Sequence, residues 1–146
     1  YGSGSNLARD SRIHHHVRGL LLAARGADSL AVTEFQRAVF SVTAGYTRTN
    51  VEMAKSLLRL GRYAEAVSIL EPATRGSLEA SNLYVTYPEI RLLLAQAYAG
   101  AGERARAERE LDWVRRAWVR ADPLLRPQLD LAARTVETTG RQRARR

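Results

Sequence analysis

Apolar residues recur along this chain at intervals of three and four, the spacing of one helix face, and glycine-containing or polar breaks separate the segments. We expect helices over about 11–26, 28–42, 47–60, 63–72, 88–100, 104–120 and 123–139, and therefore an all-α fold. The inward-facing residues expected in the first two helices are Ile13, Val17, Leu20, Leu21 and Ala24, then Leu30, Ala31, Phe35, Ala38 and Val39. Those expected in the last helix are Leu125, Leu129, Ala132, Ala133 and Val136.

Three glycines divide the chain into similar units. An alanine follows each glycine by five residues, which gives the pairs Gly26 and Ala31, Gly61 and Ala66, and Gly102 and Ala107. A small residue precedes each glycine by seven positions and a large apolar residue follows it by nine: Gly19, Ala54 and Ala95 before, and Phe35, Leu70 and Leu111 after. The glycines are 35 and 41 residues apart, and a period of this length is typical of helix-turn-helix repeats.

Helix packing gives this frame a physical meaning. Two helices that pack closely need small residues where their backbones cross, with larger apolar side chains on either side of the crossing. Glycine adopts the left-handed conformation that ends a helix at no steric cost. We therefore expect the three glycines to end helices and the small residues to lie at helix crossings.

The middle unit, over residues 47–74, resembles the tetratricopeptide repeat. The matching residues are Met53, Ala54, Leu57, Gly61, Tyr63, Ala66, Leu70 and Ala73, whereas the other two units depart from the pattern at His15, Arg18, Asp28, Arg91, Arg104 and Val114. The segments at 45–50 and 78–85 are similar to repeat regions attached to larger bacterial proteins. The resemblance covers about residues 12–120 and implies a right-handed α-solenoid of three helix pairs, with residues 123–139 as a C-terminal capping helix.

The chain has the length of one domain, with extensions at both ends. Residues 1–10 begin with a Gly/Ser-rich stretch and are expected to be a linker or a cloning remnant, and residues 11–139 form the repeat domain. Residues 140–146 contain four arginines and no acid, so we expect a disordered basic tail. The absence of cysteine excludes disulfides and thiol catalysis. It leaves the compartment open, with the cytoplasm expected first and the periplasm as the alternative.

The net charge of +8 raises the question of nucleic-acid binding, because arginines neutralise phosphates. Four of the 23 basic residues lie in the tail, and the others alternate with acids, as on a solvated surface. No apolar run approaches the roughly 20 residues that a membrane-spanning helix needs. Membrane insertion is therefore not expected, and nucleic acid is an unfavoured partner.

We expect no catalytic residues, no cofactor and no metal. The sequence has no glycine-rich phosphate loop and no serine in a strand-to-helix turn. His14, His15 and His16 are adjacent, and neighbouring side chains on a helix point about 100° apart, so the three cannot converge on one metal. One of these histidines is expected to be buried against the second helix and two to be exposed.

The resemblance implies a concave groove lined by the first helix of each pair. The groove residues expected on this basis are His16, Leu20, Arg48, Val51, Lys55, Leu58, Arg59, Leu92 and Gln96. Arg48, Lys55 and Arg59 would give it a basic centre that suits an acidic peptide, unless the last helix or another domain fills it. The expected function is a non-enzymatic protein–protein interaction scaffold for a peptide or partner domain, as part of a larger bacterial protein. The alternative is a basic adaptor that contacts nucleic acid within a transcriptional regulator.

Overall fold

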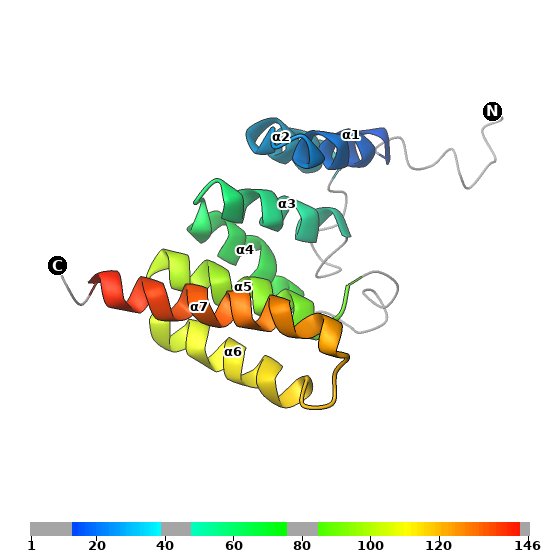
Figure 1. Ribbon diagram of the computed structural model, residues 1–146. Helices are drawn as coiled ribbons and strands as arrows, with labels where there is room; N and C mark the ends of the chain where they lie inside the picture. The colour runs from blue at the N-terminus through cyan, green and yellow to red at the C-terminus, as the bar shows by residue number, and fades with distance from the viewer. Residues whose placement is uncertain (1–12, 39–47, 76–84, 144–146) are drawn as a thin grey trace.

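The computed structural model describes residues 13–38, 48–75 and 85–143, and every regular element in these ranges is a helix (Figure 1). The all-α prediction is confirmed. The helices are α1 (Ile13–Ala24), α2 (Asp28–Ala38), α3 (Arg48–Arg59), α4 (Tyr63–Ala73), α5 (Tyr87–Ala101), α6 (Arg104–Ala117) and α7 (Arg126–Arg143), with the 3₁₀ turn η3 (Pro123–Leu125) before α7.

Each helix packs against the next one in the chain, from α1 to α6. The layers follow one another from α1 and α2 at one end to α6 at the other (Figure 1). The last helix, α7, instead turns back and packs against both α5 and α6. The first helix contacts only α2 and α3 among the described elements, so it lies at an end of the stack.

The three glycine turns have the same geometry. Gly26, Gly61 and Gly102 have φ values of 75°, 71° and 83°, in the left-handed region. In each turn the next residue donates its backbone N–H to a carbonyl five residues earlier, over 2.8 to 2.9 Å. These bonds satisfy carbonyls that a helix end otherwise leaves without a partner. The predicted helix ends at these three glycines are therefore confirmed.

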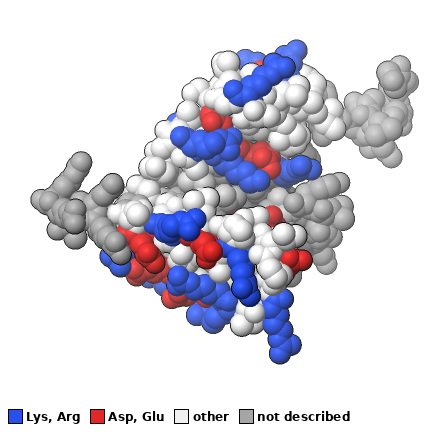
Figure 2. Space-filling view, in the orientation of Figure 1, with Lys and Arg blue, Asp and Glu red and all other residues white. Residues whose placement is uncertain are grey.

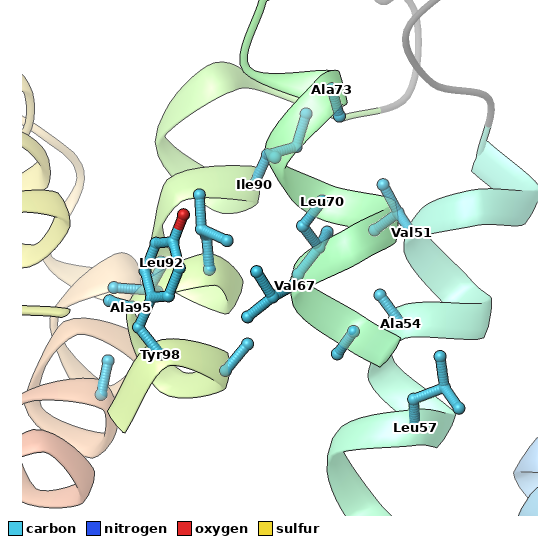
Figure 3. Close-up of a cluster of buried hydrophobic side chains, with 14 of the residues drawn as sticks. Val51, Ala54, Leu57, Val67, Leu70, Ala73, Ile90, Leu92, Ala95 and Tyr98 are labelled. Atoms are coloured by element: carbon cyan, nitrogen blue, oxygen red, sulfur yellow. The ribbon is translucent and has the colours of Figure 1, made fainter. Parts of the chain in front are cut away.

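The small and large residues of the repeated frame are all buried. They are Gly19, Ala31, Phe35, Ala54, Ala66, Leu70, Ala95, Ala107 and Leu111. A Cβ atom at position 19 would collide with the ring of Phe35, so α1 and α2 approach closely only because residue 19 is glycine. Between α3, α4 and α5, larger side chains such as Leu57, Leu70 and Ile90 fill the interior (Figure 3).

The predicted inward stripe of the first helix is wrong. Ile13, Val17 and Leu21 are 61%, 48% and 53% exposed, and Leu30 of α2 is also exposed. The reason is that α1 turns its Gly19 face toward Phe35, which leaves the opposite face of the helix outward. Leu20, Leu22 and Ala23 pack only partly against the core.

Several predicted helix ends also differ from the structure. The fourth helix ends at Ala73, next to Pro72, as predicted, whereas α6 ends at Ala117 instead of near residue 120. Asp122 caps the 3₁₀ turn by accepting a 2.8 Å hydrogen bond from the Leu124 N–H, and α7 starts only after that turn. The predicted end of the last helix at 139 is wrong, because α7 continues to Arg143. The linker at 1–10 and the tail residues 144–146 lie outside the described residues.

Candidate interaction groove

A groove of about 520 Å³ lies between α3, α5 and α7, and we call it the α3–α5 groove. From α3 it is lined by Arg48, Val51, Glu52, Lys55, Leu58 and Arg59. From α5 and the residues before it come Val85, Glu89, Leu92, Leu93 and Gln96, and α7 adds Gln128 and Leu131.

Seven of the nine groove residues expected from the sequence line this one cavity: Arg48, Val51, Lys55, Leu58, Arg59, Leu92 and Gln96. The other two, His16 and Leu20, do not line it. His16 lies on α1 with its Nδ1 2.8 Å from the Thr49 hydroxyl, and Leu20 packs partly against the core. The cavity is therefore lined by α3, α5, Val85 and α7, and α1 contributes no residue to it.

The floor of the groove is apolar. Val51 and Leu92 are almost fully buried, and Leu58 and Leu93 are partly buried beside them. Leu131 of α7 is 55% exposed at the edge of the cavity. A ligand in the groove would cover this leucine and contact the partly buried ones, which would remove apolar surface from water.

The contribution of α7 could not be predicted from its inward stripe. Ala132 and Val136 are buried, and Leu129 and Ala133 pack partly against the core, as predicted. The neighbouring Leu131 lies outside this stripe, and so does Gln128. The only sequence signal was a leucine on the otherwise polar face of the last helix. Its meaning depends on how α7 lies on α5 and α6.

The expected basic centre contains acids as well as bases, because Glu52 and Glu89 also line the groove. The Lys55 amino group lies 2.9 Å from a carboxylate oxygen of Glu52, three residues earlier on α3. The Arg59 guanidinium forms an ion pair of 2.6 Å with Asp28. Both cations line the groove, but each has an acid beside it. Charge repulsion does not dominate this surface.

The Arg59–Asp28 pair links α2 to α3. The Nε atom of Arg59 donates to both carboxylate oxygens of Asp28 at 3.0 Å, and Nη2 donates to Oδ1 at 2.6 Å. Nη2 also lies 3.0 Å from the hydroxyl of the buried Ser56. The hydrogen bonds from Arg59 lower the pKa of Asp28, although burial of the carboxylate opposes this shift. Arg59 therefore has a structural role.

Glu89 is fixed at the start of α5. Its carboxylate accepts a hydrogen bond of 2.8 Å from the backbone N–H of Thr86, and the Thr86 hydroxyl caps the helix in return. Pro88 lies in the same first turn, as predicted. The lining of the groove thus combines an apolar floor, charges held by neighbours, and the side-chain amides of Gln96 and Gln128.

The described residues contain no group of three or more His, Asp or Glu side chains that could hold a metal ion. Two of the three histidines make contacts within the fold: His15 Nδ1 lies 2.6 Å from a carboxylate oxygen of Glu34, and His16 contacts Thr49. His14 is exposed. The expectation of one buried and two exposed histidines is therefore wrong. The reason is that His15 of α1 contacts α2 and His16 contacts α3, so two histidines are partly buried.

None of the described helices is both long enough and apolar enough to cross a membrane. Comparisons of the chain with protein-family models, with curated proteins and with solved structures found no match.

Proposed function

We propose that the chain is a tetratricopeptide-like domain in which three helix pairs, α1–α2, α3–α4 and α5–α6, form a right-handed solenoid that α7 caps. Three features support this assignment. The glycine turn has the same geometry in each pair, the repeated small residues are buried, and the helices pack in chain order. Stacked repeats bury a continuous core and need a terminal element with one polar face. The amphipathic α7 meets this requirement.

We further propose that the domain is a non-enzymatic scaffold of a larger bacterial protein and that its α3–α5 groove binds a protein segment. One observation carries this proposal: seven residues chosen by their repeat position line a single cavity. The floor suits apolar side chains, and the amides of Gln96 and Gln128 can both donate to and accept from a peptide backbone. An extended peptide with apolar anchors fits this chemistry best.

The charges in the groove indicate that electrostatic attraction contributes only modestly to the affinity for a ligand. A ligand carboxylate near Lys55 or Arg59 would have to compete with Glu52 or Asp28. Acidic residues in the ligand would then contribute to its register and association rate more than to its affinity. This differs from a basic groove that selects acidic peptides by charge alone.

The distribution of charge also supports a protein partner over nucleic acid. Basic and acidic side chains alternate over the visible face of the molecule (Figure 2). Many bases lie within ion-pair distance of a carboxylate, namely Arg37, Lys55, Arg59, Arg62, Arg75, Arg91, Arg104, Arg106 and Arg115. A phosphate backbone is better held by a continuous basic surface.

Two matched leucine substitutions test the groove. Leu131 and Leu124 are both exposed and both lie near the C-terminus, but only Leu131 lines the cavity. Peptides would be selected from a random display library on the full chain, and their Kd values measured by fluorescence anisotropy. Leu131→Gln should weaken binding about tenfold, because a leucine contact is lost, whereas Leu124→Gln should leave the Kd unchanged. Equal Kd values for both variants, or no selected peptides, would contradict the proposal.

A further inference from the structure

The first helix is apolar on two opposite faces. One face packs inward around Gly19, which is buried against Phe35. The other face carries Ile13, Val17 and Leu21, which we call the α1 stripe, at 61%, 48% and 53% exposure. A helix that is hydrophobic all round is normally buried on every side. In this molecule α2 and α3 cover only one side of α1.

The spacing of the α1 stripe makes it a continuous surface. Its residues are four apart, so each lies about 40° around the helix from the previous one and the three align along one face. Single exposed apolar residues are ordinary, but an aligned set on a helix is typical of an interaction site. The α1 stripe lies outside the α3–α5 groove, to which α1 contributes no residue.

The border of the α1 stripe is basic. Arg18 shares a neighbouring face of the helix with His14, about 40° away around its axis, and Arg25 lies in the turn directly after α1. The sequence of α1 contains no acidic residue. The two buried or part-buried carboxylates of α2 are already engaged, Asp28 by Arg59 and Glu34 by His15. Glu34 also attracts Arg18 electrostatically, so the helix pair compensates the positive charge beside the α1 stripe only in part.

We propose that the α1 stripe is a second docking surface, and that its occupant is an amphipathic helix of a partner protein with acidic residues beside its apolar face. Charge complementarity selects this occupant. A second copy of this chain fits poorly, because an antiparallel pairing of α1 about a two-fold axis near Val17 would bring Arg18 near its own equivalent without an acid from α1 between them. An acidic helix would place carboxylates there instead.

Two synthetic peptides test the chemistry of the occupant. Both are helical, with leucines at i, i+4 and i+8, and one carries glutamates along the neighbouring face where the other carries lysines. Each would be titrated into the full chain at low and at physiological salt. We expect the glutamate peptide to bind at least about tenfold more tightly, with a difference that shrinks as salt rises. Equal affinity for the two peptides would overturn the proposal.

Substitutions on α1 test whether the glutamate peptide binds at the α1 stripe. The double variant Val17→Gln/Leu21→Gln should weaken the glutamate peptide about tenfold, and Arg18→Glu should remove the preference for glutamate over lysine. Leu124→Gln, at an exposed leucine elsewhere, should change neither. Thermal unfolding would establish that each variant is folded. Unchanged binding by the folded double variant would overturn the proposal.

Sedimentation of the full chain without peptide tests the competing occupant. A dimer that forms with rising concentration and is abolished by Val17→Gln/Leu21→Gln would assign the α1 stripe to a second copy and overturn the proposal. A monomer that still binds the glutamate peptide would support it. Because Leu131→Gln affects only the α3–α5 groove, failure at one surface is distinguishable from failure at the other.

Discussion

At the residue scale, the Asp28 carboxylate accepts three hydrogen bonds from the guanidinium of Arg59, 31 residues away in the chain. Asp28 is the first residue of α2 and Arg59 the last of α3. Each residue also has a local explanation, because the helix dipole favours an acid at a helix start and a base at a helix end. Only the packing of α2 on α3 brings the two together, so local patterns did not reveal the pair.

Replacing Asp28 with asparagine should destabilise the fold in a pH-dependent way. The pKa of Asp28 is lowered in the folded protein, chiefly by Arg59, so its stabilisation is complete above the unfolded pKa and is lost as pH falls through the folded one. At about pH 7, Asp28→Asn should reduce the free energy of unfolding by about 1 kcal/mol, since the Arg59 side chain is half exposed. Urea unfolding at about pH 7 and about pH 3 should show this difference shrinking at low pH. A difference that grows on acidification would contradict the assignment.

Positions 19 and 26 require glycine for two different physical reasons. At Gly19 the obstacle is the Phe35 ring, so Gly19→Ala should cost about 1–3 kcal/mol through overpacking. At Gly26 nothing lies within 4 Å of an added Cβ, and Gly26→Ala should cost only the left-handed backbone conformation, about 1 kcal/mol. Adding Phe35→Leu should recover stability in the Gly19 variant alone. Recovery in both variants, or in neither, would mean that the close approach is not the cause.

At the element scale, the sequence predicted the fold well where its signals are local. Gly26, Gly61 and Gly102 end helices by their own backbone conformation, and Ala31 and Ala66 are fully buried, which is what the predicted helix crossings require. These features repeat and therefore reinforce one another. The orientation of α1 and the edge that α7 gives to the groove depend on long-range packing, and a single hydrophobic stripe does not determine either.

The α7 helix should be necessary for a cooperative fold. Ala132 and Val136 are buried against the rest of the molecule, and removing α7 would expose the faces of α5 and α6 that it covers. A chain ending at residue 121 should aggregate or unfold with a broader, earlier transition. A chain ending at residue 139 is the matched control and should unfold like the full chain. A monomeric 1–121 chain with an unchanged transition would contradict the capping role of α7.

At the scale of the whole molecule, net charge is a poor guide to the partner. The positive excess is large, but much of it lies beside carboxylates or beyond residue 139. Binding to random duplex DNA should therefore be weaker than about 10⁻⁴ M at physiological salt, with a shallow salt dependence. Removing residues 140–146 should lower it further. A steep slope of log Kd against log salt that persists without these residues would favour the nucleic-acid function instead.

The proposed function requires that a protein segment binds between α3, α5 and α7. Backbone amide chemical shifts of the full chain, followed by NMR during titration with a display-selected peptide, test it most directly. The largest shift changes are expected at Val51, Lys55 and Leu58 of α3 and at Leu92 and Gln96 of α5, with little change on α1. If the largest changes fall instead on the exposed faces of α4 and α6, or on the α1 stripe, the α3–α5 groove is not where the peptide binds.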